Sequence, residues 1–249
     1  MRHEPIHALQ AAARDPARTA PPPSRLVIAG ATGVLGNEVL RRLVGLQRYG
    51  STEVLAREPI RAGLRGVGSR LVEGDDPAQW APGAADTGLV LFEPPRLFYD
   101  RERALWTPRP GQLPALAQWM RRSGVRTLAI VLPHAQGRLP EALKRGLASL
   151  DEQAVAALGF ERLLIVRSAR KPEPVVGGGP LAGLARWMGS VFKYMLPDSE
   201  QPVRSAKVAE FVAAALQAAP PGIHVAAPET VWRAAQGPAQ EAVHAWLRR

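Results

Sequence analysis

The chain has 249 residues, of which 46% are hydrophobic and 22% are charged, and it carries a formal net charge of +10. This composition is ordinary for a globular protein and excludes wholesale disorder. The absence of cysteine excludes disulfides, thiolate metal sites and a cysteine nucleophile. No apolar run approaches the roughly 20 residues that a membrane-spanning helix needs, so a soluble or peripheral protein is expected, with the cytoplasm as its default compartment.

Residues 1–23 are expected to form a flexible tail, and residues 24–249 a single domain. The tail is rich in Pro, Ala and Arg and lacks the apolar stretch that a secretory signal requires. Basic residues are spread over the whole chain and do not gather on one stripe with interleaved aromatic residues. No nucleic-acid partner is therefore expected, although a solvated basic surface would attract phosphorylated ligands.

Short apolar runs alternate with amphipathic stretches along most of the chain. Strands are expected at residues 25–30, 52–56, 70–73, 88–92, 125–132, 162–166 and 222–227. Apolar residues at helical spacing predict helices at residues 34–49, 113–123, 147–158 and 205–219. This alternation predicts an α/β fold, a doubly wound parallel sheet with helices on both faces and right-handed crossovers.

The first expected strand leads directly into a glycine-rich turn, Gly30-Ala31-Thr32-Gly33-Val34-Leu35-Gly36. In such a turn the first glycine permits a tight bend, the second lets the backbone approach a pyrophosphate, and the third lets the helix pack on the strand. The helix start adds unpaired N–H donors and a positive dipole. The turn therefore predicts a dinucleotide site; the alternative is a glycine turn that remains after the ligand has been lost. The residues expected to bind are Gly30, Thr32, Gly33, Val34, Leu35 and Gly36.

Two residues after later strands bear on the choice of dinucleotide. Arg57 follows the second strand, where an arginine accommodates the 2′-phosphate of NADP(H) and an acidic residue would bind the ribose of NAD(H). NADP(H) is therefore the preferred cofactor and NAD(H) the alternative, unless Arg57 is one more surface arginine. Asp75 follows the third strand, where it either bonds the adenine amino group or belongs to an Asp-Gly turn.

Together these segments resemble the atypical short-chain dehydrogenase/reductases, especially the NmrA-like and NAD(P)H-binding oxidoreductase branch. The resemblance spans roughly residues 25–235 and rests on the turn at 30–36, on residues 54–57, on Gly74-Asp75 and on residues 203–209. It implies a Rossmann fold with NADP(H) or NAD(H) in the crevice at the carboxyl ends of the strands. It also implies an oxidoreductase that acts on a small carbonyl or quinone substrate.

The sequence departs from that family where proton transfer takes place. Catalytically competent members carry a Tyr-x-x-x-Lys pair after the fifth strand, in which the lysine lowers the tyrosine pKa. The corresponding residues 140–158 contain no tyrosine, and the three tyrosines of the chain are Tyr49, Tyr99 and Tyr194. Two function classes therefore stay open: an oxidoreductase without this pair, and a non-catalytic dinucleotide-binding sensor or scaffold that acts through a protein partner.

His134 is the candidate for a substituted catalytic acid, because it ends a central strand and an imidazole titrates near neutral pH. The alternative is a loop histidine without a role, and Lys144 is a weaker candidate for contact with a phosphate or carboxylate. The five histidines show no metal-ligand spacing, so no metal is expected.

The alternation of strands and helices stops at residues 171–201, which are expected to form an excursion on the substrate side. Within it, residues 181–196 carry apolar side chains at helical spacing with two basic residues beside them. This pattern suits a lid, a core helix, a subunit interface or a helix at a membrane surface. The oligomeric state stays open.

Overall fold

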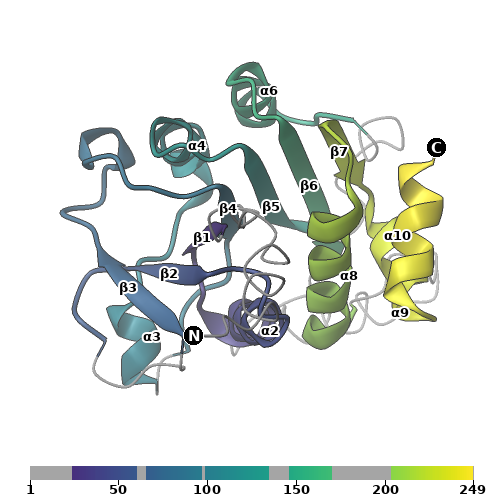
Figure 1. Ribbon diagram of the computed structural model, residues 1–249, viewed down its shortest axis with the longest axis horizontal. Coiled ribbons are helices and arrows are strands. Elements are labelled where there is room, and N and C mark those ends of the chain that lie inside the picture. The colour runs from purple at the N-terminus through teal and green to yellow at the C-terminus, as the bar shows by residue number, and fades with distance from the viewer. Residues whose placement is uncertain (1–23, 61–65, 97–98, 135–145, 170–202, 249) are drawn as a thin grey trace, which may run out of the picture.

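The computed structural model describes residues 24–60, 66–96, 99–134, 146–169 and 203–248. The expected tail and the expected excursion at 171–201 lie outside the described residues. One seven-stranded sheet forms the framework, in the order β3-β2-β1-β4-β5-β6-β7, and each neighbouring pair runs parallel (Figure 1). The expected doubly wound α/β architecture is confirmed. The strands are β1 (Arg25–Ala29), β2 (Ser51–Ala56), β3 (Val67–Leu71), β4 (Thr87–Leu91), β5 (Thr127–His134), β6 (Arg162–Ala169) and β7 (Gly222–Ala226).

Helices cover both faces of the sheet (Figure 1). One face packs against α2 (Gly33–Gly45), α8 (Ser205–Ala218), α9 (Pro228–Ala235) and α10 (Ala239–Leu247). The other face packs against α4 (Leu113–Arg122) and α6 (Leu150–Ala157), and the short helix α3 (Asp100–Ala104) lies near β3. None of the described helices is both long and apolar enough to cross a membrane.

The central strand β1 shows why this sequence makes a sheet that is covered on both sides. Leu26 and Ile28 belong to the core beneath α2 and α8, whereas Val27 and Ala29 belong to the core beneath α4. Successive side chains of a strand point to opposite faces, and all four are at most 2% exposed. Burying one such aliphatic side chain contributes about 1.5 to 3 kcal/mol, so both cores stabilise the strand.

The sheet reverses its order between β1 and β4. The chain runs outward from β1 to β2 and β3, and then returns to the other side of β1 as β4. Helices α2 and α4, which lie in the connections after β1 and β4, cover opposite faces of the sheet, and a crevice at such a switch point is where ligands bind in doubly wound sheets. The glycine turn follows β1 and Glu93 follows β4, so both border this crevice.

Two predicted boundaries on the β2 side are wrong. The third strand is Val67–Leu71 and not 70–73, because this edge strand exposes most of its side chains and its position is set by pairing with β2. The first helix ends at Gly45 and not at 49, because Gln47 takes a left-handed φ of 49° that ends the helical path.

Other predicted boundaries are also wrong, since β5 is Thr127–His134 and not 125–132, and β6 ends at Ala169 and not at 166. The described helices α3, α9 and α10 escaped sequence reasoning. Helix α6 begins at Leu150 and not at 147, because the side chain of Ser149 accepts the N–H of Glu152 and caps the helix there. Helices α9 and α10 carried a recognisable start signal in Pro228 and Pro238, since proline suits the first turn or the cap of a helix.

Candidate dinucleotide site

The turn after β1 requires glycine at two positions. Gly30 has a φ of 77°, and a Cβ atom there would lie 2.0 Å from the carbonyl oxygen of Leu91. At Gly36 a Cβ atom would lie 2.7 Å from the carbonyl carbon of Ala31, because α2 packs directly against the end of β1. These contacts account for glycine at both positions. Val34, between them, is half exposed at the start of α2.

The segment that follows β4 crosses the carboxyl ends of β1 and β2. We call it the strap, and it comprises residues 93–96 and 99–108. It pairs with the end of β2 through an isolated antiparallel bridge between Ala56 and Leu105. The strap therefore lies over the ends of the strands, where the dinucleotide is expected.

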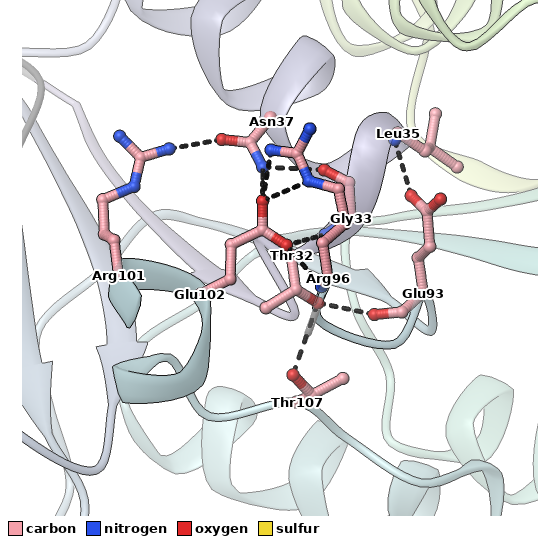
Figure 2. Close-up of polar contacts among 9 residues, drawn as sticks. All are labelled: Thr32, Gly33, Leu35, Asn37, Glu93, Arg96, Arg101, Glu102 and Thr107. Carbon is pink, nitrogen blue, oxygen red and sulfur yellow. Dashed lines mark hydrogen bonds and ion pairs between the residues drawn. The ribbon is translucent and has the colours of Figure 1, made fainter. Parts of the chain in front are cut away.

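The carboxylate of Glu93 lies against the glycine turn (Figure 2). One of its oxygens, Oε2, accepts a hydrogen bond from the backbone N–H of Leu35 at 2.5 Å. The backbone carbonyl of Glu93 accepts from the hydroxyl of Thr32 at 2.5 Å. A Cβ atom on Gly33, whose φ is 68°, would lie 2.3 Å from the carboxyl carbon of Glu93. The second glycine of the motif thus admits a close anionic neighbour, and that neighbour is a side chain of the same chain.

A second carboxylate, that of Glu102 on α3, also reaches the start of α2 (Figure 2). Oε2 of Glu102 accepts from the N–H of Gly33 at 2.9 Å, and Oε1 accepts from the amide of Asn37 at 2.7 Å. Arg96 adds its backbone N–H and its Nε, each at 2.8 Å. Glu102 is only 1% exposed, so these donors replace the water that its charge has lost.

The environment of Glu102 favours its charged form. Burial alone would raise the pKa of this carboxyl group. The hydrogen bonds from the side chain and backbone of Arg96 and from the backbone of Gly33 outweigh burial, and the pKa is lowered from its ordinary value. The start of α2 therefore faces a carboxylate whose charge is paired with the guanidinium of Arg96.

Trp106 bridges the ends of β1 and β2, beside which the adenosine half is expected. Its backbone N–H donates to the carbonyl of Leu55 at 2.9 Å, and its carbonyl accepts from the N–H of Gly30 at 3.2 Å. Its fully buried indole lies edge-on to Trp80, with ring centroids 4.8 Å apart. The indole N–H donates to Oδ1 of Asp75 at 3.3 Å.

The structure brings Arg57 and Asp75 together. Their side chains form an ion pair of 2.7 Å, and Arg109 approaches the other oxygen of Asp75 at 3.1 Å. The backbone N–H of Arg57 donates to Ala104 of the strap at 2.8 Å. The side chains of Arg57 and Asp75 are about half exposed (50% and 45%), so the pair contributes little to stability and the guanidinium of Arg57 is accessible to solvent.

The structure describes only some of the residues expected to transfer a proton. His134 is the last residue of β5, at the carboxyl end of the sheet, where its backbone pairs with Ala169. The side chain of His134 lies outside the described residues, as do Lys144 and Tyr194. Among the described residues no group of three or more metal-ligating side chains could hold a metal ion.

Neither of the two described tyrosines forms a hydrogen bond with the glycine turn. Tyr49 lines a depression with Thr87 and Thr127, the first residues of β4 and β5, which places it at the amino ends of the strands. Burial raises the pKa of its hydroxyl. Tyr99 is half exposed, with the guanidinium of Arg96 stacked 3.9 Å from its ring centre.

Sequence reasoning missed Glu93, Glu102 and Trp106. One signal for Glu93 was present: it stands two residues after β4, the strand next to β1, at the end of the sheet where the turn lies. Glu102 and Trp106 lie in a polar stretch with weak helical patterning, and no local signal marks either of them.

The overall architecture can be compared with known proteins. No family model matches this sequence, and no curated protein matches it. The chain is similar to a solved nucleoside-diphosphate-sugar epimerase from Staphylococcus aureus, with 13% identity and a TM-score of 0.46 over 78% of this chain and 66% of that one. It is also similar to the Citrobacter sp. triphenylmethane reductase complexed with NADP(H), with 17% identity and a TM-score of 0.46 over 77% and 65%.

A third similar structure is the enzyme WbmH from Bordetella bronchiseptica in complex with NAD+. The identity is 13% and the TM-score 0.42, over 85% of this chain and 80% of that one. A likeness of this size concerns the general arrangement of the sheet alone. The strand order and the glycine turn of this chain define a Rossmann-type α/β protein, which is the fold that the resemblance to the atypical short-chain dehydrogenase/reductases implies.

Proposed function

We propose that the chain binds NADP(H), with the pyrophosphate at the start of α2 and the 2′-phosphate at Arg57. One observation carries this proposal. The backbone N–H groups of Gly33 and Leu35 each hold a carboxylate oxygen, at 2.9 and 2.5 Å. Two neighbouring amides of one helix start therefore act as anion donors, and a pyrophosphate offers two neighbouring anionic groups.

Arg57 supports NADP(H) over NAD(H). Its guanidinium is half exposed at the end of β2 and already pairs with a carboxylate, that of Asp75. A guanidinium makes short, charge-assisted bonds with phosphate oxygens, and a 2′-phosphate would replace Asp75 as its partner.

Oxidoreductase chemistry is the first candidate activity. When bound, NADPH would supply a hydride to a small carbonyl or quinone, and the protein would have to donate a proton to the substrate oxygen. Tyr49 lies at the opposite end of the sheet, so the candidate donors are His134 and Tyr194.

A non-catalytic sensor or scaffold is the second candidate, and the occupied crevice favours it. A ligand that enters this crevice meets the strap, so its binding would be read out as a change at the molecular surface. The strap exposes Tyr99 and Asp100 there, and a protein partner can reach both residues.

The proposal is tested by titrating the protein with NADPH and NADH in a calorimeter, with Gly33→Ala as the variant. Gly45→Ala is the matched control, because Gly45 lies in the same helix and a Cβ atom there would meet nothing within 4 Å. We expect wild type and Gly45→Ala to bind NADPH and Gly33→Ala to lose at least tenfold in affinity. Equal binding by all three proteins would contradict the proposal.

The same proteins, offered a panel of quinones and carbonyls with NADPH, distinguish the two activities. Turnover that is lost in His134→Ala supports the oxidoreductase. Tight NADPH binding without turnover of any acceptor supports the sensor or scaffold.

A further inference from the structure

The strap contacts most of the residues that the sequence assigns to the cofactor. Six of these eight residues form a hydrogen bond with the strap: Gly30, Thr32, Gly33, Leu35, Arg57 and Asp75. The contacts run from the glycine turn to the residues that follow β2 and β3, which is the part of the crevice where the pyrophosphate and the adenosine half of a dinucleotide are expected.

The chemistry of the strap also follows that of the ligand. Two carboxylates, Glu93 and Glu102, lie on the amides expected to hold the two phosphates. The aromatic indole of Trp106 donates its N–H to Asp75, the residue expected to accept from the amino group of adenine. The carboxylates of the strap therefore lie toward the expected pyrophosphate, and its indole lies toward the expected adenine.

We propose that the strap is an intramolecular competitor of NADP(H), and that the dinucleotide binds only after the strap has left the crevice. This inference rests on the proposed NADP(H) binding and adds its regulation. The structure described is then the closed state, in which the chain occupies its own cofactor site.

Two physical conditions make the occupancies exclusive. The carboxylate of Glu93 and a pyrophosphate would claim the same N–H of Leu35, and like charges at that distance repel. Trp106 is fully buried and its backbone is bonded to Gly30 and Leu55, so adenosine finds no space beside it. The measured affinity for NADPH is then the affinity of the open state multiplied by the fraction of molecules that are open.

Glu93 and Glu102 differ in the hydrogen bonds that must break when the strap leaves the crevice. Glu93 is partly exposed, and its carboxylate accepts one hydrogen bond from the turn, that from the N–H of Leu35. Glu102 is 1% exposed and bonded to Gly33, Asn37 and Arg96. Glu93 is therefore the group whose removal relieves competition with the least damage to the fold.

A disulfide can lock the strap, because the chain contains no cysteine of its own. Ala56 and Leu105 face each other in the antiparallel bridge, flanked by the bonds from Arg57 to Ala104 and from Trp106 to Leu55. Such a non-hydrogen-bonded pair has Cα atoms about 4.5 Å apart, within the range that a disulfide spans. The variant Ala56→Cys/Leu105→Cys is therefore locked when oxidised and free when reduced.

Calorimetric titration of NADPH into the oxidised and reduced double variant gives the main test. We expect oxidation to weaken binding at least tenfold, and the single variant Leu105→Cys to show no dependence on the oxidant. Equal affinities of the oxidised and reduced double variant would overturn the competition while leaving NADP(H) binding in place. Absence of binding in every form, including the Glu93→Gln variant, would reject the proposed function and the competition with it.

The Glu93→Gln variant keeps the inference testable should the double variant fail to fold. Removing the charge weakens one charge-assisted bond of the strap, so we expect NADPH to bind about tenfold more tightly. The matched control is Asp100→Asn, which changes the same charge on the exposed side of the strap, where Asp100 pairs with Arg103. Unchanged or weaker NADPH binding by Glu93→Gln would overturn the competition.

Discussion

Glu93 accepts a hydrogen bond at 2.5 Å from the backbone N–H of Leu35, 58 positions earlier in the chain. This bond joins the two segments that border the switch point of the sheet, one after β1 and one after β4. The first turn of a helix has N–H groups without helical partners, and such groups are satisfied by a side chain, by water or by a ligand. In this chain the carboxylate of Glu93 satisfies the N–H group of Leu35.

Replacing Arg57 by Ala is expected to weaken NADPH binding by about 1.5 to 3 kcal/mol, the usual contribution of hydrogen bonds to a charged group. NADH lacks the 2′-phosphate, so its affinity should change little. Arg109→Ala is the matched control, because Arg109 also pairs with Asp75 but follows the strap and not β2. Calorimetry with both cofactors provides the measurement. Equal losses for NADPH and NADH, or tighter binding of NADH by wild type, would show that Arg57 is a surface arginine.

Replacing Glu102 by Ala is expected to lower the free energy of unfolding by about 3 to 5 kcal/mol. The substitution leaves the buried N–H of Gly33 and the side chains of Asn37 and Arg96 without their acceptor. Asp100→Ala lies on the same helix and is the control, since Asp100 is exposed to solvent. Urea denaturation followed by circular dichroism measures both. Similar midpoints for the two variants would mean that Glu102 does not hold the strap.

Acid should weaken the fold through Glu102. Its pKa in the folded protein lies below the ordinary value of 4.5, so the ionised form of Glu102 is more stable in the folded state than in the unfolded state. The resulting stability is complete above about pH 4.5 and is lost as the pH falls through the lowered pKa. Urea midpoints of wild type and Glu102→Gln, measured from pH 7 to pH 3, should therefore converge in acid. A constant difference across that range would contradict this.

Substitution of the tyrosines separates the candidate proton donors. Tyr49→Phe should leave any NADPH oxidation within a few fold of wild type, because Tyr49 lies at the amino ends of the strands. Tyr99→Phe should do the same, since its half-exposed ring stacks on Arg96 outside the turn. A general acid contributes about 100- to 10,000-fold to the rate. A loss of that size in the rate of NADPH oxidation by His134→Ala identifies His134 as the proton donor, and the same loss by Tyr194→Phe identifies Tyr194. Steady-state rates with unchanged NADPH affinity are the measurement, and such a loss in Tyr49→Phe would refute the placement.

The sequence predicts the sheet well because the signals for it are local. Apolar runs mark the central strands, and a glycine turn between a strand and a helix marks the switch point. The predicted start of the edge strand β3 lies three residues after the observed one. The side chains of β3 are mostly exposed, so pairing with β2 is the main determinant of its register.

The contacts between the strap and the expected cofactor residues could not be predicted in the same way. Glu102 acts on Gly33 across 69 positions, and Trp106 meets Asp75 across 31. A glutamate in a polar stretch between elements is most often solvated, and its sequence neighbours do not reveal a partner on a distant helix. Arg57 and Asp75 were each assigned to a ligand, and their pairing with one another depends on how the loops after β2 and β3 fold together.

The capping of α2 by Glu93 and Glu102 also bears on how the protein matures. A Rossmann turn with open amides gains part of its order from the nucleotide that occupies it, so its folding yield depends on cofactor supply. Here the chain brings its own anions to those amides. The two amides of this turn are therefore satisfied within the chain itself, and its order does not depend on a bound nucleotide.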